Sequence, residues 1–329
     1  MFTGKFYCPT GLEFGSEVDV ANEHMGGRLN NGLVILTLAL VAINLTPAAG
    51  APDKKPAAYW DFNEGSGQVV HDRAGKNDAY LGFQKEVDRY DPVWVKVSEK
   101  NYALQFDNVK EKSFVVIGKG HGGFDLKKGG FLTVSAWVKP SGLKKEVLTR
   151  KIGSTVYPMP SYLISKHTIS SPHQGWNIAI SPEKVGFSIR CEDFTEGAGA
   201  APFITNELEI PETLNAVCQK SLADGQWHHI VATVKVEDYD EFIAEAVLYL
   251  DGAEVVRRAT KVLVPTWPAS ENLNLLIGGD HMVAGYCLED PDWLTGFSGL
   301  VDEVKIFDCE VTPADVKEEY NFSRLNYGR

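Results

Sequence analysis

Short runs that alternate apolar and polar residues follow one another along most of the chain. They are rich in Val, Ile, Phe and Tyr, and glycine-containing pairs that favour turns separate several of them. Alternation with a period of two is typical of strands that have one face in a core. Because no helical pattern separates these runs, they predict an all-β sandwich rather than an α/β fold. The runs are 113–118, 131–140, 161–166, 175–181, 184–190, 228–236, 245–252, 273–279 and 299–307.

A helix is predicted at the C-terminal end, in the stretch VTPADVKEEY at 311–320. Thr312 is a typical N-cap, and Pro313 suits the first helical turn. Asp315 can complete a capping box with Thr312. We expect this short helix to pack at the edge of the sandwich.

The apolar run Leu33–Leu45 does not fit the strand pattern. It is shorter than the ~20 residues that a bilayer-spanning helix needs, but it suits the central part of a signal peptide. A basic residue precedes it, and Ala48 and Gly50 supply the small side chains that a cleavage site prefers. We therefore interpret 1–50 as an N-terminal extension and signal peptide, and 51–329 as the mature chain.

The 32 residues before this apolar run are long for the basic part of a signal peptide, and Met25 offers a shorter start. Our hypothesis is that the protein begins at Met25. The signal predicts a location that is secreted, periplasmic or at the cell surface. An uncleaved signal anchor is the alternative, and it is the one contact with a membrane that we expect.

The formal net charge is −12 over 329 residues. Nucleic acid and anionic membrane surfaces repel such a chain, so we exclude both as partners. The length suits one large β domain or two small domains.

Four of the five cysteines follow residue 50. An even number in an exported chain predicts two disulfides with three possible connectivities, and free buried thiols are the alternative. We favour pairing between nearest neighbours along the chain, which would close a long insertion loop at 192–223. The favoured pairs are Cys191–Cys218 and Cys287–Cys309.

The segment AAYWDFNEGSGQVVHDRAGKNDAYLG at 57–82 resembles the opening of laminin-G-like, concanavalin-A-like jelly-roll domains of the bacterial secreted type. Further motifs of that family follow in its order, and together they are specific although each alone is weak. The resemblance covers 57–320 and implies a two-sheet antiparallel jelly roll. The insertion at 192–223 and a long segment at 280–296 depart from the family pattern. The further motifs stand at 103–108, 132–140, 224–234, 248–252, 275–279 and 297–320.

His228 and His229 stand side by side in the motif DGQWHHIVATV. Neighbouring side chains of a strand point to opposite faces, so the two rings cannot bind one metal ion without a bulge. We predict structural histidines, one toward the core or the edge between the sheets and one toward solvent. We reject a zinc site.

Jelly-roll glucanases are the enzymes that the resemblance suggests, and they need paired carboxylates on one strand face. The spacing occurs once, at Glu17, Asp19 and Glu23, in the part that we expect to be absent from the mature protein. Asp302 and Glu303 are neighbours in a strand, so we expect them to face opposite sides. No Gly-x-Ser-x-Gly motif or phosphate-binding loop occurs. The sequence therefore favours a protein that is not an enzyme.

The resemblance also implies one structural calcium ion between an early loop and the closing strand. Calcium prefers carboxylate, amide and carbonyl oxygens, and HDRAGKND at 71–78 has that composition. An Asx turn with surface carboxylates is the alternative interpretation. The implied ligands are Asp72, Asn77, Asp302 and a carbonyl near Gly75.

Aromatic side chains are candidates for stacking on sugar rings. Trp60, Trp137 and Trp227 lie in the strand motifs and are expected in the core. Recognition is usually placed on the loops of a rigid sandwich, and the loop at 280–296 holds aromatic residues among carboxylates. The candidate ligand-binding residues are Trp176, Tyr286 and Trp293.

We therefore predict an exported, non-catalytic binding or adhesion module with a carbohydrate or cell-surface glycan as its ligand. Two alternatives stay open. One is a polysaccharide hydrolase or lyase of the jelly-roll type, and the other is a domain that binds proteins at the cell surface.

Overall fold

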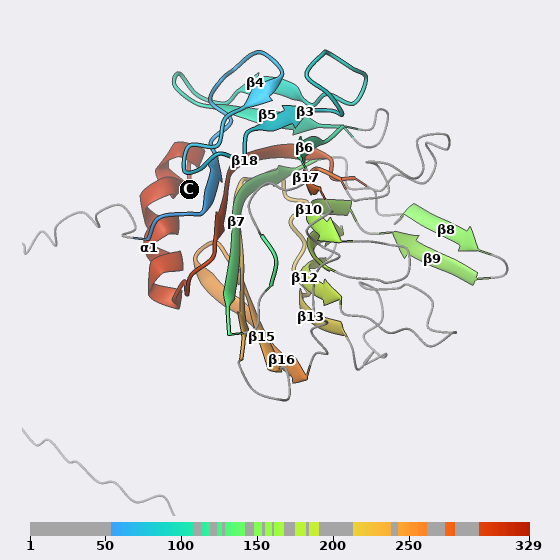
Figure 1. The fold of residues 1–329 in the computed structure, drawn as a ribbon, viewed down its shortest axis with the longest axis vertical. Coiled ribbons are helices and arrows are strands. Elements are labelled where there is room, and N and C mark those ends of the chain that lie inside the picture. The colour runs from blue at the N-terminus through green and yellow to red at the C-terminus, as the bar shows by residue number, and fades with distance from the viewer. Residues whose placement is uncertain are drawn as a thin grey trace, which may run out of the picture. The chain divides into compact units, whose positions relative to one another are not determined.

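The computed structural model describes a β-sandwich with a C-terminal helix (Figure 1). The described residues are 54–107, 113–118, 124–126, 129–141, 148–152, 155–159, 161–167, 175–181, 184–190, 213–237, 243–261, 274–279 and 296–329. The signal segment Leu33–Leu45 and the alternative start Met25 lie outside them. In the described part of the chain, no helix is long and apolar enough to cross a membrane.

The first sheet has eight antiparallel strands in the order β16-β15-β14-β7-β18-β5-β4, with β1 paired to β18. Its centre is formed by segments far apart in sequence, because β7 lies between β14 and β18. The strands are β1 (Ala58–Trp60), β4 (Val93–Lys96), β5 (Tyr102–Phe106), β7 (Phe131–Pro140), β14 (His228–Val236), β15 (Ile243–Leu250), β16 (Ala253–Lys261) and β18 (Gly299–Phe307).

The second sheet also has eight strands, in the order β13-β12-β11-β10-β17-β6-β3-β2. A separate hairpin joins β8 (Leu148–Ile152) to β9 (Thr155–Met159). The strands of the second sheet are β2 (Val69–Val70), β3 (Ala79–Leu81), β6 (Val115–Ile117), β10 (Ser161–His167), β11 (Gly175–Ser181), β12 (Lys184–Arg190), β13 (Thr213–Cys218) and β17 (Leu275–Ile277).

All nine predicted runs contain strands, and the predicted two-sheet architecture is confirmed. The prediction of a loop over the whole of 192–223 is wrong for its last part. Residues 213–218 form β13, which pairs with β12 and ends the second sheet. Residues 192–212 lie outside the described part.

The core lies between the two sheets, where alternate residues of each strand meet. In β14, Ile230, Ala232 and Val234 belong to this core, and in β11 Trp176, Ile178 and Ile180 do. The intervening residues of each strand therefore point to the outer face of its sheet. We call these surfaces the outer face of the first sheet and the outer face of the second sheet.

Helix α1 (Pro313–Ser323) continues into the short 3-10 helix η3 (Arg324–Tyr327). The predicted capping box is confirmed, since Thr312 and Asp315 cap each other's backbone N–H groups. The predicted position at the sandwich edge is wrong. Val316 packs with Val231 and Phe307 on the outer face of the first sheet, so α1 covers that face (Figure 1).

Candidate functional site

His228 is clamped between two turns at the start of β14. Its Nδ1 lies 3.0 Å from Asp251 Oδ2, and its Nε2 lies 3.0 Å from Asp224 Oδ1. Burial acts to lower the pKa of His228, but the two carboxylates outweigh it and raise the pKa above its ordinary value. The ring thus ties the turns on either side of the strand to each other, which is a structural role.

His229 lies on the outer face of the first sheet, beneath α1. Its ring stacks on Trp137 with centroids 5.1 Å apart, and its Nε2 lies 2.9 Å from Ser135 Oγ. Burial lowers the pKa of His229 to about 4. The prediction that one of the two histidines faces solvent is wrong, because each residue is only 1% exposed. The helix that covers this face could not be placed there from the sequence.

A buried ion pair joins the helix to the sheet next to His229. Lys305 Nζ lies 3.1 Å from Glu319 Oε1 of α1 and 3.1 Å from Glu303 Oε2. Burial opposes the charged form of both partners, yet Lys305 lowers the pKa of Glu319, and Glu319 and Glu303 raise the pKa of Lys305. Both groups are therefore charged at neutral pH, and each depends on the other.

A β-bulge places Asp302 and Glu303 on the same side of β18. The pairing register with β7 shifts between Asp302 and Lys305, and Glu303 has a left-handed φ of 52°. Asp302 Oδ2 accepts hydrogen bonds from Tyr327 Oη at 2.7 Å and Asn101 Nδ2 at 2.8 Å, while Glu303 Oε2 accepts one from Tyr59 Oη. The prediction that these neighbours face opposite sides is therefore wrong. Burial, followed by the charge of Glu303, raises the pKa of Asp302 well above its usual range.

Asp72 organises the early loop that the sequence marked as a calcium site. Its Oδ1 accepts hydrogen bonds from the backbone N–H groups of Tyr59 and Ala74, at 2.9 and 3.0 Å. Its Oδ2 accepts from the backbone N and Nδ2 of Asn77, at 3.0 and 2.9 Å. A Cβ at Gly75 would lie 2.6 Å from Asp72 Oδ2, so only glycine allows the loop to close this tightly.

The four implied calcium ligands do not form one ion site in this arrangement. Asp72 and Asn77 bind each other, whereas Asp302 binds Asn101 and Tyr327. Each oxygen of Asp72 already accepts two N–H groups, which fill its lone-pair positions. Among the described residues, no three His, Cys, Asp or Glu side chains are placed to share a metal ion. Calcium therefore stays a prediction that addition and chelation of the ion would test.

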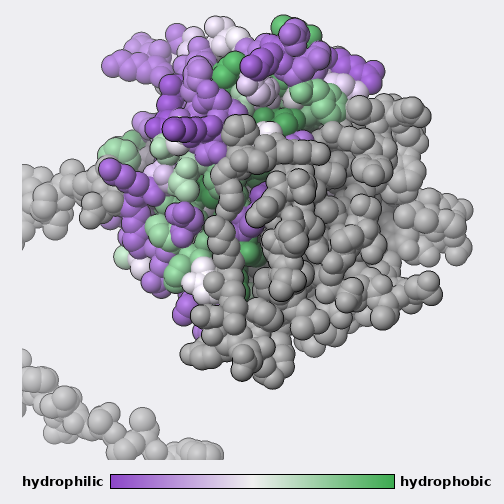
Figure 2. Space-filling view, viewed as in Figure 1, coloured by the Kyte–Doolittle hydropathy of each residue, from purple (hydrophilic) through white to green (hydrophobic). Residues whose placement is uncertain are grey.

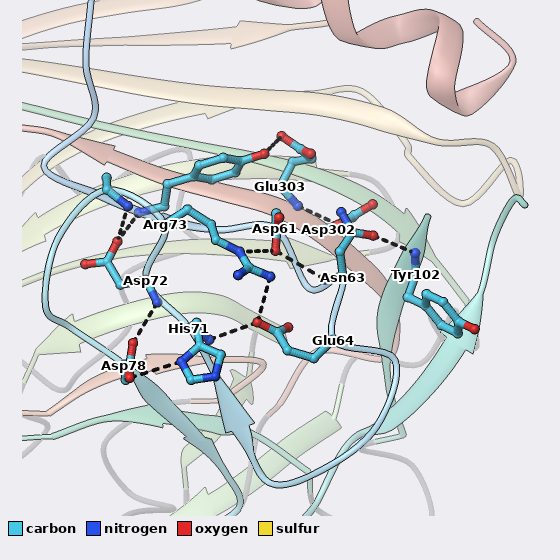
Figure 3. Close-up of polar contacts among 12 residues, drawn as sticks. Asp61, Asn63, Glu64, His71, Asp72, Arg73, Asp78, Tyr102, Asp302 and Glu303 are labelled. Carbon is cyan, nitrogen blue, oxygen red and sulfur yellow. Dashed lines mark hydrogen bonds and ion pairs between the residues drawn. The ribbon is translucent and has the colours of Figure 1, made fainter. Parts of the chain in front are cut away.

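The other charged groups of this loop bond to one another (Figure 3). Arg73 Nε lies 3.0 Å from Asp61 Oδ1, and its guanidinium also reaches Glu64 Oε1 at 3.1 Å. His71 and Asp78 form an exposed pair at 3.2 Å. Exposed pairs of this kind add little stability, so the loop is held mainly by the buried hydrogen bonds between Asp72 and Asn77.

Trp176 has no face open to a ligand. Its side chain is fully buried between the sheets, and its Nε1–H donates to the carbonyl of Phe124 at 2.8 Å. Its burial corrects the prediction that Trp176 binds ligand. Trp60, Trp137 and Trp227 are buried, as predicted, although Trp137 and Trp227 pack with Tyr327 beneath the C-terminal segment. Tyr286 and Trp293 lie outside the described residues, so their role stays a prediction.

The two ends of the candidate ligand loop are held on the second sheet, beside β10. Gly279 precedes the loop, and its carbonyl accepts a hydrogen bond of 2.8 Å from Ser165 Oγ. Gly296, the last residue of the loop, forms a β-bridge with Tyr162. Both attachment points therefore belong to β10, which lies next to β11.

Asn177 lies beside these attachment points and was not predicted. In β11 it stands opposite Ser165 of β10 and alternates with the core residues Trp176 and Ile178, so it points to the outer face. It has 0% exposed surface, and neither its Oδ1 nor its Nδ2 has a hydrogen-bond partner. The sequence signal is an asparagine in the middle of the apolar strand GWNIAIS, where asparagine is disfavoured. We call Asn177, Ser165 and Tyr162 the Asn177 site.

A family model described as the concanavalin A-like lectin/glucanases superfamily matches residues 113–317. The chain belongs to this superfamily. Its two-sheet sandwich is the fold that the sequence motifs implied, and β6 to β18 lie within the matched range, which ends inside α1.

Solved structures resemble this superfamily member only distantly. Domain 4 of an extracellular arabinanase from Geobacillus stearothermophilus, in complex with arabinotriose, has 14% identity and a TM-score of 0.43, covering 81% of this chain and 98% of that one. The binding domain of botulinum neurotoxin serotype G has 12% identity and a TM-score of 0.49, covering 82% of this chain and 51% of that one. The chain thus matches about half the length of the neurotoxin domain. No curated protein matches the sequence.

The superfamily description includes glucanases, so we compared the buried polar residues beside His229 with a catalytic triad. Ser135, His229 and Glu319 are close, but Ser135 Oγ and Glu319 both lie on the Nε2 side of the ring, with Glu319 Oε1 4.0 Å from Nε2. A nucleophilic triad needs the acid on Nδ1, and Nδ1 of His229 has no partner. All three residues are buried where α1 meets the first sheet, so we assign them to the packing of the helix.

The cysteine predictions are untested. Cys218 and Cys309 are half-buried and not bonded to each other. Their predicted partners, Cys191 and Cys287, lie outside the described residues.

Proposed function

We propose that this protein is an exported, non-catalytic carbohydrate-binding module, and that the Asn177 site contributes its central polar contact. The observation that carries the proposal is the fully buried amide of Asn177, which has no hydrogen-bond partner. An unsatisfied buried polar group costs about 1–3 kcal/mol of stability. In folded proteins the hydrogen bonds of such a group are completed by an ordered water molecule, an ion or a ligand, and we assign a ligand to Asn177.

The chemistry of an amide suits a sugar. Its oxygen accepts and its nitrogen donates, so one amide can bind two neighbouring hydroxyl groups of a pyranose or furanose ring. Ser165, opposite Asn177, adds a hydroxyl that can accept a further bond. Because Asn177 has no exposed surface, a sugar reaches it only if this face opens.

The two residues at the ends of the segment 280–296 support the same location. Gly279, which precedes it, and Gly296, its last residue, are both bound to β10. Tyr286 and Trp293 within it are the predicted stacking residues. Aromatic stacking above a polar amide is a general arrangement for sugar recognition, because rings cover the apolar sugar face and amides bind its edge.

Retention on insoluble polysaccharides tests the proposal. Purified residues 51–329 are expected to be retained without releasing sugar. Asn177→Leu removes both polar atoms of the amide and keeps the number of side-chain heavy atoms, and it is expected to abolish retention. Gln105→Leu is the matched control, because it removes an exposed amide from β5 in the first sheet.

Two outcomes would contradict this proposal. Released sugar would show that the protein is an enzyme. Equal retention of Asn177→Leu and Gln105→Leu would show that the Asn177 site does not bind the polysaccharide.

Binding to another protein is the second candidate, and two exposed apolar side chains favour it. Phe322 and Leu325, near the C-terminus, are 56% and 74% exposed. Elsewhere the described surface over β4 and β5 is mainly hydrophilic in the view of Figure 2. Absence of retention on every polysaccharide, together with capture of a protein partner lost in Phe322→Ser, would place this candidate first.

Export is part of the proposal and has its own test. Expression of the full chain is expected to give a secreted product that begins near residue 51. N-terminal sequencing reads this directly, and a peptide from residues 1–24 would contradict the start at Met25.

A further inference from the structure

A small open pocket lies on the outer face of the first sheet, beyond the start of α1. Its volume is ≈ 100 Å³, and strands β7, β14, β15 and β16 line it together with the segment that leads into the helix. The part of this face nearer His229 is covered by α1, whereas the pocket occupies the remaining part. It is therefore separate from the Asn177 site, which is on the other sheet.

Two threonines and a tyrosine form the polar floor of the pocket. Thr133 of β7 stands directly opposite Thr233 of β14, so their side chains are neighbours across the two strands. The hydroxyl of Tyr249 is hydrogen-bonded to the Thr233 side chain. Hydroxyl groups both donate and accept, and they match the hydroxyl groups of a ligand without charge.

One wall is a guanidinium held in place by two carboxylates. Arg257 donates from Nη1 to Glu245 Oε1 at 2.6 Å and from Nε and Nη2 to Glu254, at 3.0 and 2.8 Å. These bonds orient the planar group and engage its Nε, Nη1 and Nη2 donors.

Both cations of the pocket lining already have carboxylate partners. Arg257 binds Glu245 and Glu254, and Lys235 Nζ lies 3.8 Å from Glu237 Oε1, while Glu310 adds a further carboxylate to the lining. An anionic ligand would meet cations that are already neutralised, whereas a neutral polar ligand can bond to the hydroxyl groups and carboxylates of the lining. The rim adds apolar surface, from the half-buried ring of Phe131 and the exposed ring of Pro313.

We propose that this pocket binds one neutral sugar residue, as a second carbohydrate site on the sheet opposite the Asn177 site. The choice of a sugar rests on the proposed function, while the neutrality and the single residue follow from the lining and the volume. A pocket this small lies well below the ~300–1,000 Å³ of sites that enclose larger ligands, so it suits the end or a branch of a glycan.

Two sites on opposite outer faces have a consequence for function. One short oligosaccharide cannot contact both, but two glycan chains can be held by one domain. The protein would then bridge chains, and its attachment to a dense glycan surface would exceed the affinity of either site by avidity.

Binding of methyl glycosides of neutral pentoses and hexoses tests the proposal, measured by ligand-observed NMR and calorimetry on residues 51–329. Thr133→Val replaces a hydroxyl by a methyl group in the pocket floor, and Thr133→Ser keeps the hydroxyl. We expect at least one neutral glycoside to bind about tenfold more weakly to Thr133→Val, and nearly as before to Thr133→Ser, which corresponds to about 1.4 kcal/mol. Melting temperatures of both variants verify that the fold is intact.

The Asn177→Leu variant separates this proposal from the proposed function. If the pocket is a sugar site, Asn177→Leu loses retention on polysaccharide but still binds the glycoside, and Thr133→Val shows the reverse loss. Unchanged glycoside binding in Thr133→Val would overturn the pocket while leaving the Asn177 site standing. Absence of binding for every neutral glycoside would also overturn the pocket, whatever the polysaccharide result.

Discussion

The outer faces of the two sheets both carry buried polar side chains, but the two faces differ in how completely these side chains are paired. On the first sheet, Lys305 and Glu319 neutralise each other beneath α1, and Asp302 accepts bonds from Tyr327 and Asn101. On the second sheet, the amide of Asn177 is just as deeply buried and has no partner. The first arrangement fastens a helix to a sheet, whereas the second leaves hydrogen-bonding capacity unused.

This difference indicates how the domain divides stability and binding. A paired charge under a helix resists opening, because separating the partners leaves a charge in a medium that solvates it poorly. An unpaired amide lowers stability and favours any ligand that can satisfy it. We therefore place stability on the helix-covered face and binding on the face that includes Asn177.

The largest expected effect on stability comes from breaking the ion pair between Lys305 and Glu319. Glu319→Gln leaves Lys305 buried without its helix partner, and we expect a loss of about 3–5 kcal/mol in the free energy of unfolding. Glu318→Gln, on the neighbouring helix position, is the control. Urea unfolding measures both, and equal losses would show that the ion pair does not hold the helix.

The two adjacent histidines are expected to make stability depend on pH in opposite directions. Burial lowers the pKa of His229 from its ordinary 6.5 to about 4, so between these values the unfolded chain binds the extra proton. The contribution of the neutral His229 ring to the free energy of unfolding is complete above pH 6.5. It is lost as the pH falls toward 4, by about 3 kcal/mol in total. Unfolding of His229→Gln is expected to depend less on pH in this window.

The pKa of His228 is shifted in the opposite direction to that of His229, so His228 serves as the control. Its pKa is raised, so its contribution is complete below pH 6.5 and is lost as pH rises through the folded-state pKa. His228→Gln should therefore change the pH dependence above 6.5 and not below it. A change in the same window for both variants would contradict the separate environments of the two rings.

Replacement of Asn177 is expected to change stability by a smaller amount, and to increase it. Asn177→Leu removes an unsatisfied buried amide, and we expect a gain of about 1–2 kcal/mol in stability together with the loss of binding. Thermal unfolding measures the gain. Destabilisation by Asn177→Leu would mean that the amide is satisfied in solution and would remove the reason for placing the ligand there.

The smallest effect concerns the start of α1. Thr312→Ala removes the capping side chain that accepts from the Asp315 N–H, and we expect a loss of about 1 kcal/mol. Thr312→Ser keeps the capping hydroxyl and should lose much less. If the two variants lose the same amount, docking on the sheet rather than capping determines the helix start.

Local pattern predicted the strands and the capped helix, since both depend on residues close in sequence. The bulge in β18 was missed because Asp302 and Glu303 look like any strand neighbours until β7 pairs with them in a shifted register. Strand β13 was missed because the segment at 213–218 becomes a strand at the edge of a sheet supplied by other parts of the chain. The burial of Trp176 is similar, since its position in β11 decides which face it occupies.

By itself, the sequence determined the all-β class, the order of the family motifs, the capping box and the opposite orientation of His228 and His229, because each follows from the periodicity or chemistry of neighbouring residues. Only the tertiary structure decided which face α1 covers, how Lys305 meets Glu319, and that Asn177 is buried without a partner. These depend on contacts between residues far apart in the chain, where burial and pairing are set by what packs above each side chain.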